Sequence, residues 1–270
     1  MTADPGSLAI RRGYADTAFG QVHYAECGSG PPVVLLHQTP RSWDEYREVL
    51  SPLGHTHRAI AMDTIGFGAS APVVDHSIET YAAAVLAFFD ALGLPRAALV
   101  GHHTGGVIAV EVTAAAPERV ERLVLSSTPY IDAEARRRRK DLPPIDLVEV
   151  DPNGTHLGEL WGRRQGFYPP GRPDLLTRFI RDALVHDPAD LEAGHEAVGR
   201  YRMEERIGRI GCRVLCIGAT ADPYAFPELQ RLRAHLPGAD IAVVDGGMVP
   251  LMEEHPSEVA ELIARFLTDA

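Results

Sequence analysis

The chain has 270 residues, 45% of them hydrophobic and 23% charged, which suits a globular protein with a sizeable buried core. Its formal net charge of −11 argues against the basic face that a nucleic-acid-binding protein needs. It lacks the run of about 18 apolar residues that a membrane-spanning helix requires, and its first twenty residues lack the pattern of a secretory signal. We therefore expect a cytoplasmic protein with neither a nucleic-acid nor a membrane partner.

Short apolar runs bounded by turn residues alternate with helical patterns. The predicted strands cover residues 21–27, 33–36, 58–62, 97–100, 122–126, 213–217 and 241–244. The predicted helices cover residues 81–92, 107–115 and 259–267, and Gly93 is expected to cap the first of them. This alternation predicts an α/β protein, with a mostly parallel sheet and helices on both faces. In such a sheet the chemistry gathers at the carboxyl ends of the strands.

Residues 128–211 break the alternation, because the segments PPID, DPNG and YPPGRP separate short helical patterns. We expect residues 128–211 to form a cap over the strand ends, and residues 1–127 and 212–270 to form the core domain. The basic run at residues 136–140 has acidic neighbours on both sides, which is typical of a solvated helix end. The three cysteines, Cys27, Cys212 and Cys216, fit a reducing compartment, and the last two are predicted to fill the core.

A sharp turn is predicted where the strand at 97–100 meets the helix at 107–115. The sequence there, Gly101-His102-His103-Thr104-Gly105, matches the pattern Gly-x-nucleophile-x-Gly in everything but the nucleophile itself. Glycines are needed on both sides because larger side chains would collide in so tight a turn. The other register puts Thr104 at the tip, but it sets the bulky His102 where a small residue is required. We therefore place His103 at the tip.

Taken together, these motifs resemble those of the α/β-hydrolase superfamily over nearly the whole chain. The segments that carry the resemblance, besides GHHTGG, are His37-Gln38-Thr39-Pro40, the loop at residues 63–70 (DTIGFGAS), Gly218 to Asp222, and Gly247-Met248 followed by Glu254-His255-Pro256. The resemblance implies the α/β-hydrolase fold, an eight-stranded, mostly parallel sheet with helices on both faces. It also implies a helical cap of roughly 80 residues between the sixth and seventh strands.

Two of the three positions that carry catalysis in this superfamily are altered. The resemblance places His103 at the nucleophile position and Met248 at the base position, and only Asp222 stands as expected for the acid. His255 is better explained as an exposed residue before a helix than as a replacement base. Because histidine is longer than serine, we expect His103 to reach Asp222 and form a dyad that works as a general base. Ordinary acyl-enzyme chemistry is not expected here.

Backbone N–H groups supply the oxyanion site in this superfamily, which here implies those of Thr39 and Thr104. The further candidates for substrate contact are His37, Gln38, Trp43, Trp161 and Met248. Packing in the core is the better explanation for either tryptophan.

The first functional hypothesis is a cofactor-independent enzyme acting on a small carbonyl compound such as an ester, a lactone or a polyketide-like metabolite. The reaction would be hydrolysis by activated water, or a non-hydrolytic elimination, isomerisation or cyclisation. The alternative is a hydrolase-fold protein that binds a small molecule without turnover. A metal site built from His37 and His103 with His102 or Asp222 is disfavoured, because no other ligand spacing supports it. The expected partner is a small molecule, and a homodimer is left open.

Overall fold

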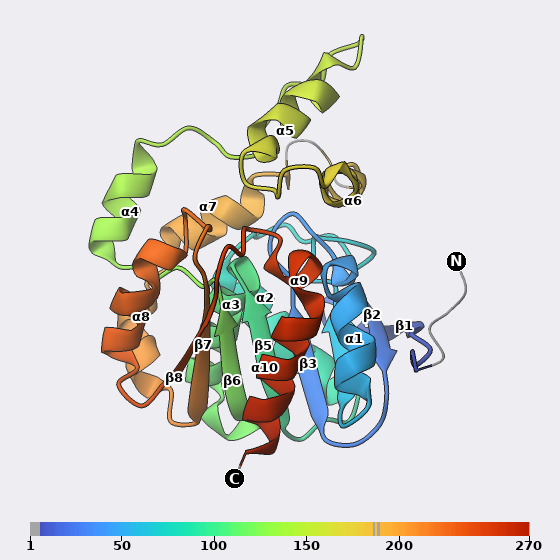
Figure 1. Cartoon of the computed structure of the whole chain (residues 1–270), viewed down its shortest axis with the longest axis vertical. Helices are drawn as coiled ribbons and strands as arrows, with labels where there is room; N and C mark the ends of the chain where they lie inside the picture. Colours follow the sequence, from blue (N-terminus) through green and yellow to red (C-terminus); the bar gives the residue numbers. More distant parts are fainter. Residues whose placement is uncertain (1–5, 186, 188–189, 270) are drawn as a thin grey trace.

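The computed structural model describes residues 6–185, 187 and 190–269, and it contains an eight-stranded sheet (Figure 1). The strand order is β1-β2-β4-β3-β5-β6-β7-β8, and only the pairs β1/β2 and β2/β4 are antiparallel. The strands are β1 (Arg11–Thr17), β2 (Gly20–Cys27), β3 (Pro32–Leu36), β4 (Arg58–Met62), β5 (Ala97–His102), β6 (Val120–Ser126), β7 (Arg213–Ala219) and β8 (Asp240–Val244). The predicted α/β-hydrolase fold, with its mostly parallel sheet, is confirmed.

Helices cover both faces of the sheet, as predicted (Figure 1). One face packs against α2 (Ile78–Ala91), α3 (Thr104–Ala115) and α8 (Leu229–His235), and the other against α1 (Arg47–Gly54), α9 (Leu251–Glu254) and α10 (Pro256–Thr268). Gly93 follows α2 with a φ of +64°, the left-handed conformation expected of a residue after a helix end. No helix in the described part of the chain is both long and apolar enough to cross a bilayer.

Residues 128–211, here called the cap segment, connect β6 to β7. They contain the helices α4 (Ala133–Lys140), α5 (Thr155–Gln165), α6 (Pro173–Ala183) and α7 (Ala193–Arg200). Figure 1 shows these helices gathered at one end of the sheet. Residues of α5, α6 and their connections form a small apolar cluster of their own, which includes Leu160, Tyr168 and Phe179, whereas Val198 of α7 joins the main core. The cap segment is therefore packed partly on itself and partly on the sheet.

Buried charges attach α6 to the rest of the chain. Arg41 is fully buried, and its Nε donates to Asp182 Oδ2 of α6 at 2.9 Å. The other nitrogens of Arg41 bind Glu253 of α9 at 2.5 and 3.0 Å. Arg178 of α6 adds contacts to Asp44 at 2.9 Å and to Glu253 at 3.1 Å. The guanidinium groups and carboxylates thus neutralise one another where water is excluded.

The attachment of α4 is of a different kind. Arg138 pairs with Glu228 at 2.8 Å, and Asp132, the N-cap of the helix, pairs with Arg231 at 2.6 Å. Side chains in these pairs keep between 15% and 52% of their surface in contact with solvent. Such exposed pairs contribute about 0–1 kcal/mol each, so α4 is held more weakly than α6.

Candidate active site

The turn between β5 and α3 places His103 at its tip. Strand β5 ends at His102 and α3 begins at Thr104, while His103 between them has φ 46° and ψ −113°. A side chain on Gly101 would collide with the carbonyl oxygen of Gly105, and one on Gly105 would collide with that of Leu36. Only glycine fits at either position. The strained backbone therefore projects the imidazole of His103 from the end of the sheet.

The structure brings His103 and Asp222 together. Their atoms Nε2 and Oδ2 lie 2.8 Å apart, in an off-axis approach that makes a close electrostatic contact rather than a well-aligned hydrogen bond. Asp222 follows β7 and is only 1% exposed, and its other oxygen accepts hydrogen bonds from the amides of Tyr224 (2.9 Å) and Ala225 (3.1 Å). Burial alone would raise the pKa of Asp222, but His103 and these amides lower it to about 2. The carboxylate is therefore ionised and fixed beside the imidazole.

The side chain of His102 packs against the turn that carries His103. It is fully buried, and its ring lies perpendicular to that of His103 with the ring centres 4.7 Å apart. Its Nε2 donates to the carbonyl oxygen of Val249 at 3.0 Å, and its Nδ1 lies 3.1 Å from Ser126 Oγ. Burial and the neighbouring His103 lower the pKa of His102 to about 3, so it is neutral at physiological pH. Its role is to hold the turn against the loop after β8.

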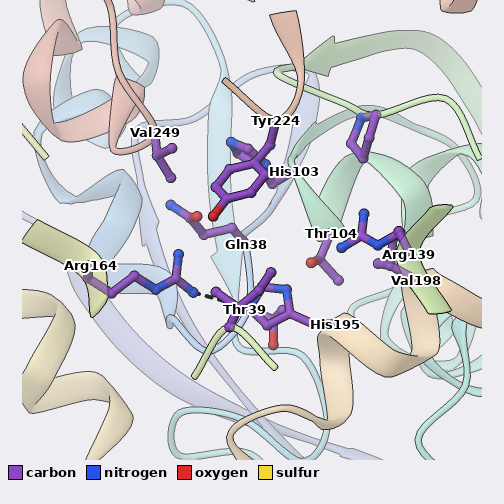
Figure 2. A pocket seen from close by; sticks show the side chains of 12 residues that line it. Gln38, Thr39, His103, Thr104, Arg139, Arg164, His195, Val198, Tyr224 and Val249 are labelled. Atoms are coloured by element: carbon purple, nitrogen blue, oxygen red, sulfur yellow. Dashed lines mark hydrogen bonds between the residues drawn. The ribbon is translucent and has the colours of Figure 1, made fainter. Parts of the chain in front are cut away.

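A cavity lies in front of His103, between the sheet and the cap segment (Figure 2). On the sheet side it is lined by Gln38, Thr39, His103, Thr104, Tyr224 and Val249. On the cap side it is lined by Pro129, Arg139, Ile145, Arg164, His195 and Val198. The cavity is thus bounded on one side by parts of the fold that the sheet holds rigidly, and on the other by helices of the cap segment.

The two amides expected to form an oxyanion site both border this cavity. The backbone N–H groups of Thr39 and Thr104 have no hydrogen-bond partner within the described chain. Thr104 is the first residue of α3, so the helix dipole adds to the positive potential at its amide. Gln38 is held by Glu45, whose two oxygens accept from the backbone N–H of Gln38 at 2.8 Å and from its Nε2 at 2.6 Å. The loop after β3 therefore presents the free amide of Thr39 from a backbone that Glu45 fixes.

The comparisons with known proteins agree with this architecture. The family model for the alpha/beta hydrolase fold matches residues 31–254. The chain belongs to the α/β-hydrolase fold family. A haloalkane dehalogenase of Agrobacterium fabrum is 36% identical to this α/β-hydrolase, over 95% of this chain and 92% of the relative.

Other curated relatives match only in part. Bifunctional epoxide hydrolase 2 of Sus scrofa is 31% identical over 56% of this α/β-hydrolase and 27% of its own length. Haloalkane dehalogenase 2 of Mycobacterium tuberculosis H37Rv is 32% identical over 55% of this chain and 54% of its own. The match thus spans between about a quarter and a half of these relatives' length.

Solved structures share the fold of this α/β-hydrolase at lower identity. The enol-lactonase of Burkholderia xenovorans LB400 superposes with a TM-score of 0.78 at 22% identity, covering 95% of this chain and 100% of the lactonase. E-2-(acetamidomethylene)succinate hydrolase superposes with a TM-score of 0.79 at 19% identity, covering 97% and 100%. At such identities the likeness shows the fold alone.

Two of the residues considered for substrate contact hold loops of this α/β-hydrolase in place. His37 uses both ring nitrogens on the backbone: Nδ1 lies 2.7 Å from the carbonyl oxygen of Gln38, and Nε2 accepts from the amide of Thr64 at 3.0 Å. Met248 donates its amide to Glu254 Oε2 at 2.7 Å, and its neighbour Val249 lines the cavity in its place. Neither His37 nor Met248 is among the residues that line the cavity.

The two tryptophans also lie elsewhere. Trp43 packs on the core between the guanidinium groups of Arg12 and Arg47, which lie 5.8 and 5.4 Å from its ring centre. Trp161 lines a separate cavity within the cap segment, next to Tyr168.

Within the described residues no three histidine, cysteine, aspartate or glutamate side chains converge as a metal site would need.

The cap segment contributes charged residues that the sequence analysis did not single out. Arg164 donates its Nε to Asp146 Oδ1 at 2.6 Å and a second nitrogen to Oδ2, while His195 Nε2 lies 2.9 Å from the same Oδ2. The charge of Arg164 is therefore balanced by Asp146. No sequence signal links these residues, since they come from three separate parts of the cap segment.

Arg139 corrects the prediction of a solvated helix end at residues 136–140. Arg137 is exposed as expected, but Arg139 is half-buried and lines the cavity. The structure explains this orientation: Ala135, one helical turn earlier, is buried, and residues four apart share a helix face.

Proposed function

We propose that this α/β-hydrolase is a cofactor-independent enzyme that hydrolyses a small ester or lactone, with His103 as general base and Asp222 as its orienting partner. The observation that carries the proposal is the 2.8 Å contact between His103 Nε2 and Asp222 Oδ2 at the edge of a cavity bordered by two free amides. An ionised carboxylate beside Nε2 favours the tautomer that carries its proton there. The lone pair of Nδ1 is then available to accept a proton.

In this mechanism, His103 Nδ1 removes a proton from a water molecule as the water oxygen attacks the carbonyl carbon. The negative charge that develops on the carbonyl oxygen is stabilised by the amides of Thr39 and Thr104. As the intermediate collapses, the protonated imidazole returns the proton to the leaving alkoxide. No bond forms between substrate and protein, so an acyl-enzyme is absent from the sequence of steps.

The two free amides favour a carbonyl substrate over a haloalkane. Displacement of a halide at a saturated carbon builds no charge on oxygen, whereas addition to a carbonyl does. The names of the relatives include a haloalkane dehalogenase and an epoxide hydrolase, and those of the structural neighbours include an enol-lactonase. A screen of small esters and lactones, with one haloalkane and one epoxide, therefore distinguishes the reaction classes.

The roles of His103 and Asp222 are tested by substitution. We expect His103→Ala, His103→Gln and Asp222→Asn each to lower kcat/KM by about 10²–10⁴-fold. His55→Ala, which removes an exposed histidine far along the chain from the site, is the control and should retain activity. Thermal melts of all four variants verify folding. Unchanged activity in either His103 variant would remove the proposed base.

Three further outcomes would redirect the proposal. A serine-directed phosphonate should leave the protein unlabelled, and a labelled residue in the cavity would identify a nucleophile instead. Consumption of substrate without incorporation of oxygen from ¹⁸O-labelled water would assign an elimination, isomerisation or cyclisation to the same base. Binding of the screened compounds without conversion would identify a binding protein.

A further inference from the structure

One guanidinium group that lines the cavity, that of Arg139, takes part in no ion pair within the described residues. Arg139 projects from α4 into the cavity, and Figure 2 shows its guanidinium end directed toward Thr104. Within the described parts of the chain this guanidinium forms no hydrogen bond or ion pair, and only the longer-range charges of Glu192 and Tyr224 act on it. A guanidinium stays protonated at neutral pH, so the cavity keeps its positive charge.

The hydrogen-bonding groups of the neighbouring charged residues are taken up by other partners. Arg164 is paired with Asp146, which also faces His195. Glu192 is the acid whose field reaches Arg139 most directly, but its Oε2 accepts hydrogen bonds from the amides of Ile145 (2.9 Å) and Asp146 (2.7 Å). Removing a guanidinium from water without a partner is costly, and an anion bound at Arg139 would offset that cost.

We propose that Arg139 is an anion subsite and that the substrate carries a carboxylate group in addition to its reacting carbonyl. This inference rests on the proposed function for the position of the reacting carbonyl, next to Thr39 and Thr104. A planar guanidinium binds a carboxylate through two parallel hydrogen bonds. Because the Arg139 guanidinium has no hydrogen-bonded partner, its donors are available to one carboxylate, and the apolar side chains of Ile145 and Val198 line the same cavity for the carbon chain that joins the two groups.

The subsite is tested by binding, independently of turnover. Hexanoate and hexanamide have the same length and shape and differ in charge, and their dissociation constants can be measured by isothermal titration calorimetry. We expect the wild-type protein to bind hexanoate at least tenfold more tightly than hexanamide. Arg139→Gln should abolish this preference, and Arg139→Lys should retain part of it, since lysine keeps the charge without the paired donors.

Arg137→Gln is the matched control, because it removes the same charge from an exposed position on the same helix. It should leave the preference for hexanoate unchanged, which excludes a general effect of net charge. Equal affinity of the wild-type protein for the two probes, or full retention of the preference in Arg139→Gln, would overturn the subsite. Inorganic phosphate is the third probe: binding tighter than hexanoate and dependent on Arg139 would replace the carboxylate by a phosphate group.

Turnover is then compared, per ester group, with monomethyl adipate and dimethyl adipate, in which the free carboxylate of the first is replaced by a second methyl ester. We expect the monoester to have the higher kcat/KM, and Arg139→Gln to remove that advantage mainly through KM. A protein that prefers hexanoate but hydrolyses neither ester would retain the subsite and lose the proposed function. If the protein hydrolyses both esters with equal efficiency and binds the two probes equally, the proposed function is retained and the subsite is lost.

Discussion

Glu45 shows how a residue outside the cavity can affect it. Its carboxyl group is fully buried and holds both the backbone and the side chain of Gln38. Burial raises the pKa of Glu45 from its usual value near 4.5 to about 7, although Arg41 and Gln38 oppose the shift. Between these two pH values the folded protein keeps a proton that the unfolded chain has lost. The contribution of Glu45 to stability is therefore greatest below pH 4.5 and declines as the pH rises to about 7.

Replacement of Glu45 by Gln removes this dependence. We expect the free energy of unfolding of Glu45→Gln, relative to the wild type, to rise by on the order of 3 kcal/mol between pH 4.5 and pH 8. Urea denaturation at the two pH values measures the difference. Glu149→Gln, the same change outside the buried core, is the control and should show a much smaller pH effect. A constant difference between wild type and Glu45→Gln would contradict the raised pKa.

At the scale of residues, local turn chemistry made part of the site predictable. The glycines that restrict the turn around His103 are visible in the sequence, and so is the position of Asp222 after a buried strand. The structure brings these two side chains together, whereas their catalytic roles stay a proposal. Arg139 and Tyr224 were not singled out, because the cavity wall to which they belong exists only when the cap segment packs on the sheet.

The attachment of α6 gives a prediction at the scale of elements. Arg41 has no exposed surface and forms ion pairs with both Asp182 and Glu253. We expect Arg41→Ala to lower the free energy of unfolding by about 3–5 kcal/mol, since it removes the fully buried partner of two buried carboxylates and leaves them only the less buried Arg178 and Arg181. Urea denaturation gives the value. The control, Arg202→Ala, breaks an exposed pair with Glu205 and should cost less than about 1 kcal/mol.

Two outcomes of that experiment would contradict the prediction. A loss as small as that of Arg202→Ala would mean that water or another cation replaces Arg41. A biphasic transition in Arg41→Ala would mean that α6 separates from the sheet before the core unfolds, in which case the single free energy would not apply.

The elements themselves differ in how predictable they were. Runs of apolar residues located β3, β4 and β5, because strands buried on both faces leave a continuous signal. Strand β1 was not predicted: it is a mostly exposed edge strand with the sequence RRGYADT, so burial leaves almost no pattern in it. The helices of the cap segment were expected as a group, but their packing was not, since buried ion pairs between distant residues have no local sequence signal.

At the scale of the whole molecule, the cap segment has one firmly and one loosely attached part. Buried charges fix α6, whereas exposed pairs hold α4. We expect backbone amides of α4 to exchange with deuterium faster than those of α6, as followed by mass spectrometry of peptides. Raising the salt concentration from 0.05 to 1 M should speed exchange in α4 and leave α6 unchanged, because salt screens exposed pairs far more than buried ones. Equal protection of both helices would contradict this difference.

The position of Arg139 on α4 places the proposed recognition of the substrate on a different part of the fold from the proposed catalytic groups. His103 and Asp222 stand on the sheet, so the group proposed to perform the reaction belongs to the most stable part of the fold. The group proposed to choose the substrate stands on a short helix whose replacement would disturb few buried contacts. Such a division makes the protein adaptable: substitutions on one surface helix can change which acid is accepted, while the reaction itself is inherited unchanged.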